Sequence, residues 1–508
     1  MKSLQTASIF NDNMVLQRDK PINFWGESEP GNKVSIKISD NFSDTYTDIH
    51  GKWKVSFPPM QGGGPYEVRI TDGINCITYK NVMIGEVWFA GGQSNMQFEL
   101  CRCNSFNQTS EKLNSGISDI RCYITAKQSY FSDDFLSKEK SVRWLTEADG
   151  DFCAVSAVAY YAAEQLSIHF PGISIGIVCC YWGGTSASTW IDCDTLRHNI
   201  ILSEYITDYQ KATEGQTDEE YKEKFNEFLE YNSVWYDKYN KLLQKRPHMT
   251  WDEAVSILGP DRWCPPLGPY SQCAPGVLFN TMFMRVCPYT VKGIWFYQGE
   301  SDDHKPDIYS VLMDALIKKW RECWNNSDLP FIFIQLPMFS EDGRQDNKSW
   351  ARIREEQQKV FDTVKNTGMV VSIDQGEYNN IHPTEKKYVG QRLGKQSLMY
   401  AYNIENDSEV YGPVFAGCRI ENNIAEISFA NADDGLYVHG NKINGFELSG
   451  HDGKFISADA EIKGSHVILS SSDVKTPEYV RYLFTDYSDV NLFGKNKIPA
   501  SPFRTDIF

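Results

Sequence analysis

The sequence reads Ile84-Gly85-Glu86-Val87-Trp88-Phe89-Ala90-Gly91-Gly92-Gln93-Ser94-Asn95-Met96 where an apolar run meets a polar turn. A short apolar run bounded by turn residues is consistent with a buried strand, and the paired glycines allow the backbone to bend sharply after it. Open α/β sheets bind their ligands at the carboxyl ends of their strands. The stretch therefore predicts an α/β fold that holds Ser94 at that edge, where it is a candidate nucleophile if a base lies within reach.

A histidine much further along the chain stands in a matching context. Residues 369–373 form another apolar run, a polar loop follows, and His382 comes directly before Pro383, where a helical pattern begins. Because the carboxyl ends of parallel strands meet at one edge of a sheet, we expect His382 to lie close to Ser94. An imidazole within reach of a serine hydroxyl is the usual base that activates it.

The rest of the chain divides into three predicted parts. Residues 1–82 show short alternating runs separated by Asp, Asn, Gly and Pro, which predicts a β-sandwich. Residues 83–408 alternate apolar runs with helical patterns, which predicts a parallel sheet covered on both faces, with a helical insert at about 198–272. Residues 409–508 return to short strands. The predicted strands of the sheet are 84–90, 173–180, 291–297, 330–336 and 369–373.

The composition limits the class of protein. A chain of 508 residues with 41% hydrophobic residues can build two or three domains. Its 50 basic and 67 acidic residues give a net charge of −17, a field that repels nucleic acid and anionic membranes. The sequence shows no apolar run of about 18 residues that would span a membrane. Because residues 1–7 lack the apolar core of a signal peptide, we expect a cytoplasmic protein, with a removed leader and secretion as the alternative.

The cysteine pattern does not indicate a metal site. The clusters Cys101-Arg102-Cys103 and Cys179-Cys180 lack the spacing of zinc ligands. Several of the 13 cysteines lie in apolar runs, where cysteine behaves as a small hydrophobic side chain. We therefore expect reduced thiols and no metal.

Two further strand ends carry polar, glycine-rich loops, at 181–191 and at 297–302. Acyl transfer from a serine builds negative charge on the former carbonyl oxygen, and this oxyanion needs donors that are already in place. We predict that the donors are the backbone N–H groups of Ser94 and Gly184 and the side-chain amide of Gln298.

Four motifs resemble the serine, glycine, amide and histidine blocks of the SGNH (GDSL-like) hydrolases. They are Gly-Gly-Gln-Ser-Asn-Met at 91–96, Trp-Gly-Gly-Thr at 182–185, Tyr-Gln-Gly-Glu-Ser-Asp at 297–302 and Ile-His-Pro at 381–383. Residues 13–18 and 498–506 narrow the resemblance to the sialate O-acetylesterase group. The resemblance implies a flavodoxin-like, three-layer α/β/α catalytic domain and hydrolysis of O-acetyl esters, most of all those of sialic acid. It also implies a small-molecule or oligosaccharide substrate and no metal or organic cofactor.

One position departs from the family pattern. Related sequences often place an aspartate two or three residues before the histidine, where this chain has Asn380 and Asn379. An amide can hold an imidazole but does not stabilise its charged form as a carboxylate does. Four interpretations remain open: a dyad whose ring is held by a backbone carbonyl or an amide, a carboxylate from the same loop, a carboxylate from the loop at 297–302, or a weakened enzyme. The side chains considered for orienting His382 are Asn380, Glu377, Asp374, Glu300 and Asp302.

Two residues are candidates for binding the substrate. Arg354 matches a further block of the family and shares a predicted helix face with Gln357, although a solvated helix face with one ion pair gives the same pattern. Trp182 follows a strand end and could stack on a sugar ring, although aromatic residues beside a sheet often belong to the core.

Three other functions compete with a sialate esterase. One is an acetylesterase acting on neutral plant polysaccharide such as xylan or xyloglucan, another is a lipase-like enzyme, and the third is a carbohydrate-binding protein without catalysis. A sugar that carries a carboxylate should find a basic side chain near Ser94, whereas a neutral glycan needs none. A binding protein does not require Ser94 and His382 to meet.

Overall fold

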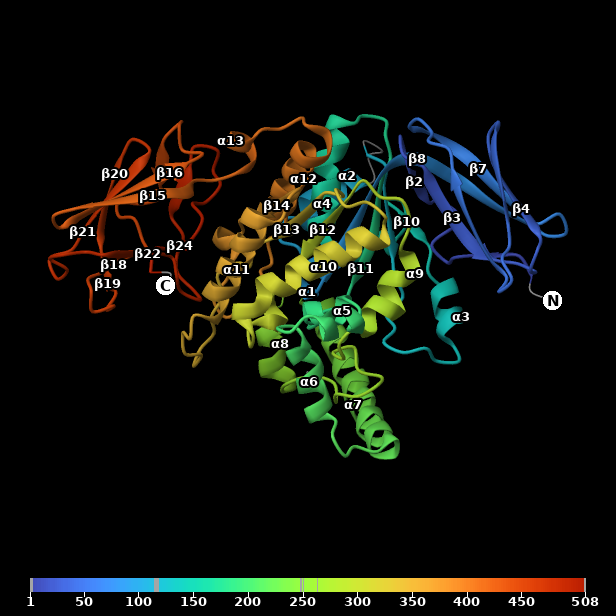
Figure 1. Cartoon of the computed structure of the whole chain (residues 1–508), viewed down its shortest axis with the longest axis horizontal. Coiled ribbons are helices and arrows are strands. Elements are labelled where there is room, and N and C mark those ends of the chain that lie inside the picture. The colour runs from blue at the N-terminus through green and yellow to red at the C-terminus, as the bar shows by residue number, and fades with distance from the viewer. Residues whose placement is uncertain (1–2, 114–117, 247–248, 250, 263, 507–508) are drawn as a thin grey trace.

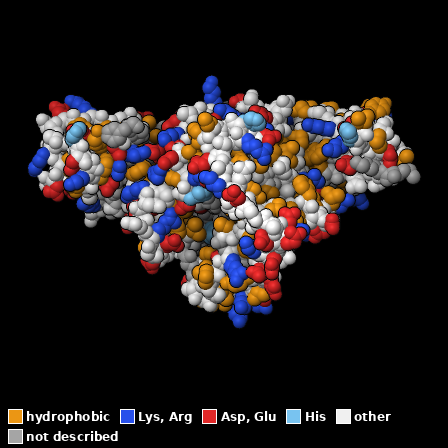
Figure 2. All heavy atoms as spheres, turned by 60° about the horizontal axis from the view of Figure 1, so that its bottom comes forward, with side chains coloured by type: hydrophobic (Ala, Val, Ile, Leu, Met, Phe, Trp, Pro, Cys, Tyr) orange, Lys and Arg blue, Asp and Glu red, His pale blue; other side chains and the backbone are white. Residues whose placement is uncertain are grey.

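The computed structural model describes residues 3–113, 118–246, 249, 251–262 and 264–506. The central α/β part lies between an N-terminal group of strands at one end and a C-terminal group of strands at the other, and a helical projection extends from its lower side (Figure 1). On the face turned forward in Figure 2, basic and acidic side chains are interspersed with scattered hydrophobic ones. No helix in the described ranges is long and apolar enough to cross a membrane.

The central sheet has the strand order β10-β9-β11-β8-β12-β13-β14. Its strands are β8 (Cys76–Gly92), β9 (Ile120–Ile124), β10 (Trp144–Thr146), β11 (Ile175–Tyr181), β12 (Gly293–Tyr297), β13 (Phe331–Ile334) and β14 (Thr367–Val370). All neighbours pair in parallel except β10, which runs antiparallel to β9. The α/β class predicted from the sequence is confirmed, but β9 and β10 were not among the predicted strands, and the antiparallel β10 makes the sheet mixed.

Helices cover both faces of this sheet. Phe89 of β8 packs edge-on against Trp320 of α10 (Tyr309–Cys323), with ring centres 5.3 Å apart. The preceding residue, Trp88, faces the opposite side of the sheet and stacks on Trp295 of β12, with ring centres 4.9 Å apart. The indole N–H of Trp295 donates to Ser397 of α12 (Lys387–Tyr402). Because successive side chains of a strand point to opposite faces, α10 and α12 lie on opposite sides of the sheet. Helix α11 (Ser349–Thr363) packs beside α10, and α4 (Ala157–His169) packs beside α12.

Strand β8 belongs to two sheets at once. Its first half pairs antiparallel with β7 (Gly63–Thr71) and parallel with β2 (Val15–Gln17), and its second half pairs with β11 and β12. The boundary predicted between residues 82 and 83 therefore falls inside one continuous strand. The remaining N-terminal strands are β1 (Gln5–Thr6), β3 (Ile22–Glu27), β4 (Lys33–Ile38), β5 (Asn41–Tyr46) and β6 (Lys52–Phe57).

The helical projection consists of α5 (Cys193–His198), α6 (Ser203–Ala212), α7 (Asp218–Lys245) and α8 (Trp251–Leu258). Helix α7 begins with the capping box expected from the sequence, in which the Thr217 side chain accepts from the Glu220 N–H and the Glu220 carboxylate accepts from the Thr217 N–H. Trp235 and Tyr239 of α7 pack with Trp251 of α8 in a small cluster of their own. The projection is thus internally packed and does not depend on the central core alone.

The C-terminal strands form two four-stranded antiparallel sheets and one pair. The first sheet contains β15 (Val414–Glu421), β16 (Ile424–Ala430), β20 (Asp459–Lys463) and β21 (His466–Ser470); the second contains β18 (Phe446–Ser449), β19 (Ile456–Ser457), β22 (Tyr479–Tyr482) and β24 (Phe503–Arg504); the pair is β17 (Leu436–Val438) and β23 (Leu492–Gly494). The short helices elsewhere are α1 (Ser94–Gln97), α2 (Phe106–Leu113), α3 (Phe135–Lys140), α9 (Met284–Val286) and α13 (Asp407–Val410).

The glycine that ends β8 has no room for a side chain. Gly92 has φ +134°, and a Cβ atom added to it would lie 2.1 Å from the carbonyl oxygen of Tyr297 in β12. We predict that Gly92→Ala separates β8 from β12 just before Ser94, where α1 begins. The variant should have a lower melting temperature and no activity.

A matched control is Gly73→Ala, in the turn before β8, where φ is +86° and an added Cβ meets nothing within 4 Å. This variant carries only the backbone strain of a positive φ, about 1–2 kcal/mol. Thermal unfolding followed by circular dichroism compares the two variants, and equal losses of stability would contradict the steric explanation.

Candidate active site

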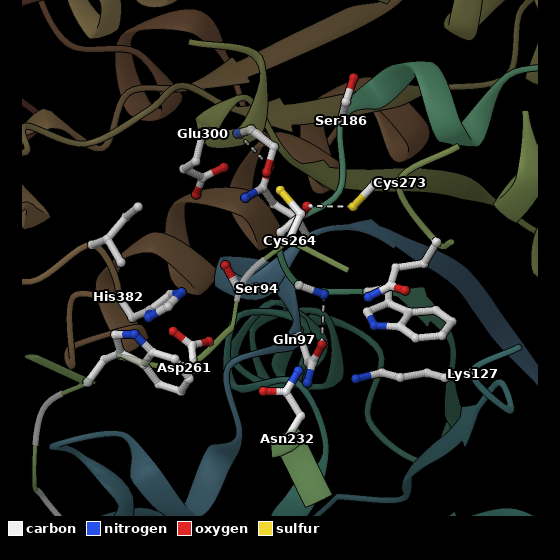
Figure 3. Close-up of a pocket in the computed structure, with 18 of the residues that line it drawn as sticks. Ser94, Gln97, Lys127, Ser186, Asn232, Asp261, Cys264, Cys273, Glu300 and His382 are labelled. Atoms are coloured by element: carbon white, nitrogen blue, oxygen red, sulfur yellow. Dashed lines mark hydrogen bonds between the residues drawn. The ribbon is translucent and has the colours of Figure 1, made fainter. Parts of the chain in front are cut away.

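Ser94 and His382 line the same cavity. Ser94 is the first residue of α1, directly after the end of β8, and His382 lies on the loop between β14 and α12. The cavity has a volume of about 1210 Å³. In Figure 3 the hydroxyl of Ser94 and the ring of His382 are directed toward one another. The structure therefore brings together the two residues whose meeting was expected from the strand-end argument.

An asparagine ties the nucleophile helix to the histidine loop. The side-chain nitrogen of Asn95 donates to the carbonyl of Ile381 at 3.0 Å and to Glu300 at 2.5 Å. The Asn95 oxygen accepts from Lys386 Nζ at 2.7 Å. Since Ile381 directly precedes His382, Asn95 fixes the distance between the two sides of the site. The sequence analysis did not single out Asn95, although its place directly after Ser94 was a signal.

The loop that carries His382 is held by its own polar side chains. The backbone N–H of His382 donates to Asn380 Oδ1 at 3.1 Å, and Asn380 Nδ2 donates to Glu377 at 2.6 Å. Glu377 also accepts from the N–H and the hydroxyl of Thr384. Asn380 and Glu377 therefore hold the main chain of the loop, which differs from the predicted role of holding the imidazole.

The other carboxylates considered for orienting the ring bond elsewhere. Asp374 pairs with Arg392 at 2.6 Å, Glu300 accepts from Asn95, and Asp302 accepts from Ser186, Ala187, Gln298 and Tyr205. Within the described ranges, none of the hydrogen bonds of these groups reaches the imidazole. The contact recorded for the ring is Trp251 of α8, edge-on at 6.1 Å. Of the four interpretations, the dyad of Ser94 and His382 agrees best with this arrangement.

The environment keeps His382 neutral. Burial, with smaller contributions from the positive charges of Lys386 and Arg102, lowers the pKa of His382 to about 3. A neutral imidazole can accept the proton of a serine. Because the ring is buried and positive rather than negative charges face it, it is a weak base, and ester hydrolysis at such a site would depend strongly on stabilising the oxyanion.

The glycine loop after β11 packs directly against the nucleophile. A Cβ atom added to Gly183 would lie 3.2 Å from Cβ of Ser94, and the N–H of Gly183 donates to Gln97 at 3.0 Å. Gly184 lines the cavity with φ +68°, a conformation that favours glycine. The N–H of Ser94 lies in the first turn of α1, where a helix offers no acceptor. Both residues predicted as backbone donors thus line the same cavity.

The role predicted for Gln298 is wrong. Its side chain is 1% exposed, its nitrogen donates to Gln93 at 3.1 Å and to Asp302 at 2.6 Å, and its oxygen accepts from Tyr309 at 2.8 Å. The amide is fully used beneath the cavity. It holds the oxygen of Gln93, which also accepts from the N–H of Ser301 at 3.2 Å. Gln93 itself lines the cavity beside Ser94, so its side-chain nitrogen replaces Gln298 as the candidate third donor.

The role predicted for Arg354 is also wrong. Its side chain is 1% exposed and donates to the carbonyls of Pro337 and Thr485. Burial lowers the pKa of Arg354 to about 10. Arg354 therefore joins α11 to the C-terminal strands and does not reach the cavity. Trp182, in contrast, lines the cavity.

The helical insert forms one wall of the cavity. Phe228, Tyr236 and Tyr239 of α7 and Trp251 of α8 line it together with Trp182. The described residues contain no group of three His, Cys, Asp or Glu side chains that could hold a metal ion. The cavity thus combines a serine, a histidine and backbone donors with aromatic walls, an arrangement suited to ester hydrolysis on a bulky substrate.

Replacing the amide of Asn380 by a carboxylate tests its role in holding the loop. We predict that Asn380→Asp lowers activity at least about ten-fold, because a second carboxylate would face Glu377 across a distance of 2.6 Å. The double variant Asn380→Asp, Glu377→Gln restores a donor and acceptor pair and should recover most of the activity. Acetate release with thermal unfolding as a control measures both variants. Full activity of Asn380→Asp alone would contradict this account of the loop.

Comparisons with known proteins agree with the resemblance. Residues 269–399 match the family of carbohydrate esterases described as sialic acid-specific acetylesterases. The chain is 27% identical to the sialate O-acetylesterase of Mus musculus over 443 residues, 79% of this chain and 74% of that protein. It is 24% identical to that of Rattus norvegicus over 557 residues, 99% of this chain and 94% of that protein.

The fold is similar to that of a solved structure, a carbohydrate acetylesterase from Xanthomonas citri. The identity is 26%, the TM-score is 0.78, and the similarity covers 99% of this chain and 100% of the other. The motifs at 91–96, 182–185, 297–302 and 381–383, the matched family domain and the similarity along most of the chain agree with one another: the chain is similar to the sialate O-acetylesterases, and residues 269–399 match the sialic acid-specific acetylesterase family of carbohydrate esterases.

Proposed function

We propose that this carboxylic-ester hydrolase removes O-acetyl groups from sugars, most of all from O-acetylated sialic acid, with Ser94 as nucleophile and His382 as base. The observation that carries the proposal is that Ser94 and His382 line one cavity and are directed toward one another, and Gly184 lines the same cavity. A binding protein without catalysis has no need of this meeting. The family relatives named as sialate O-acetylesterases support the choice of ester and sugar.

The mechanism follows from the geometry. His382 takes the proton of the Ser94 hydroxyl as its oxygen attacks the acetyl carbonyl carbon, and the oxyanion accepts from the N–H groups of Ser94 and Gly184 and from Gln93. The protonated imidazole then gives its proton to the departing sugar oxygen, leaving an acetyl ester on Ser94. Water attacks this ester with His382 again as base, which releases acetate and restores the hydroxyl.

The finer fold assignment is part of the same proposal. Ser94 after β8, the glycine loop after β11 and His382 after β14 follow the order of blocks in a flavodoxin-like, three-layer SGNH hydrolase domain. Helices on both faces of a mostly parallel sheet support this architecture. We propose that this domain spans about 83–408, with flanking β-regions at 1–82 and 409–508, although β8 is shared across the first boundary.

A neutral acetylated polysaccharide is the second candidate substrate. The cavity of about 1210 Å³ exceeds the needs of a monosaccharide, and its aromatic wall offers surfaces on which sugar rings could stack. Acetate release from acetylated xylan, measured beside release from 9-O-acetyl sialic acid, decides between the two substrates.

The nucleophile gives the sharpest test. We predict that Ser94→Ala lowers acetate release from p-nitrophenyl acetate and 9-O-acetyl sialic acid by at least about 10³-fold and leaves the melting temperature unchanged. The control is Ser188→Ala. Ser188 lines the same cavity, and its hydroxyl oxygen lies 2.9 Å from that of Ser186. Turnover that persists in Ser94→Ala and falls in Ser188→Ala would end the proposed mechanism.

The low basicity of His382 predicts an unusual pH profile. A lowered pKa keeps the neutral form present as the pH falls, so kcat/KM for p-nitrophenyl acetate should stay level between pH 8 and pH 5. An ordinary histidine would lose activity below its pKa of about 6.5. Tryptophan fluorescence at each pH confirms that the protein stays folded. A midpoint near pH 6.5 would contradict the environment described for the ring.

A further inference from the structure

Among the described residues, one basic side chain of the cavity has no hydrogen-bond or ion-pair partner. Lys127 follows the carboxyl end of β9, at the same sheet edge as Ser94, and its side chain lines the cavity. Its Nζ lies 5.9 Å from the ring centre of Trp182. No hydrogen bond or ion pair of Lys127 with any other described residue is found, and its side chain remains accessible to water. In Figure 3 the amino end of Lys127 extends into the cavity, on the side where Gln97 and Asn232 lie.

The other basic side chains of the cavity are already engaged. Arg102 donates to the hydroxyl of Tyr239 at 2.5 Å. Lys305 pairs with Asp208 at 2.8 Å and with Glu204 at 3.2 Å. Of these three described cations, Lys305 is paired with carboxylates and Arg102 is held by a hydroxyl, whereas Lys127 is the one whose hydrogen-bond donors are left for a ligand.

The surroundings of Lys127 disfavour its charge. Enclosure by protein lowers the pKa of Lys127 to about 8, and the nearby carboxylate of Glu99 offsets part of this effect. The ammonium is thus still largely charged at neutral pH, and a carboxylate bound beside it would favour the charged form. The other acidic side chains on the cavity wall, at Asp208, Asp261, Glu300 and Asp303, repel an arriving anion from the parts of the wall that they occupy.

Two neighbouring contacts relate the position of the Lys127 ammonium to that of Ser94. The ring centre of Trp182 lies 5.9 Å from Nζ of Lys127. The next residue, Gly183, approaches Ser94 so closely that an added Cβ atom would lie 3.2 Å from Cβ of Ser94. Two consecutive residues therefore connect the part of the cavity wall beside Lys127 to the part beside Ser94.

We propose that Lys127 binds the carboxylate of an acidic sugar while Ser94 attacks an O-acetyl group on the same sugar. This inference rests on the proposed esterase function and assigns its preference for a carboxylate-bearing substrate to one side chain. Trp182 supplies the apolar floor beside the ammonium, and a neutral glycan would leave Lys127 unused.

The test compares an acid with its neutral ester. The substrates are 9-O-acetyl-N-acetylneuraminic acid, its methyl ester and p-nitrophenyl acetate, and the variant is Lys127→Gln. A lost charge-assisted hydrogen bond weakens binding by about ten-fold or more. We expect KM for the acid to rise by about that factor with little change in kcat, so that the preference for the acid over its methyl ester disappears. Lys127→Arg should restore most of the preference.

The matched control is Lys305→Gln, which removes a lysine from the same cavity wall whose charge is paired with Asp208 and Glu204. We expect this variant to keep the preference for the acid. An acid preference that survives in Lys127→Gln, or that is absent from the unaltered protein, would overturn the inference.

Two further outcomes are separable. If the unaltered protein hydrolyses none of the three esters, the proposed function fails, and the inference fails with it. If it hydrolyses p-nitrophenyl acetate and acetylated xylan but no acidic sugar, the esterase stands and Lys127 has no carboxylate to bind. Acetylated galacturonan serves as a final arm, because turnover that depends on Lys127 and exceeds that of sialic acid supports the carboxylate site and assigns it to uronic acids.

Discussion

The active site depends on a close main-chain contact between β8 and β12. Gly92 approaches the carbonyl of Tyr297 so tightly that a side chain has no room there, and the N–H of the next residue, Gln93, donates to that carbonyl at 3.0 Å. This contact ends β8 and starts α1 in one step. The positions of Ser94, of Gln93 and of Asn95 all follow from where this turn is held. A rigid sheet, rather than a flexible loop, therefore sets the geometry of the nucleophile.

A buried polar network carries that geometry across to the histidine. Glu300, Asn95 and Lys386 form a chain of hydrogen bonds, and Asn95 reaches the carbonyl of Ile381. Burial raises the pKa of Glu300 and lowers that of Lys386 to about 8, while each charge partly compensates the other. Glu300 thus braces the two halves of the site. Networks of this kind are costly when one member is lost, because the remaining groups stay buried without partners.

Sequence reasoning found what depends on strand ends and missed what depends on side-chain direction. The apolar runs, Ser94, His382 and the glycine loop could be predicted, because parallel strands deliver their carboxyl ends to one edge. Gln298 and Arg354 were assigned wrongly because residue type does not reveal whether an amide or guanidinium faces a cavity or the core. The boundary at 82 and 83 falls inside β8, which passes without a turn from one sheet into the next. Lys127 belongs to no motif, so nothing in the sequence marked it.

The wall contributed by α7 and α8 separates chemistry from recognition. The groups proposed to break the ester come from the sheet edge, whereas much of the remaining cavity wall comes from a segment that packs within itself. Evolution can therefore exchange or reshape that segment without disturbing the reaction. Enzymes with the same nucleophile and base, but different inserts, would then diverge toward different glycans. Grafting such segments between relatives is a direct route to new substrate preferences.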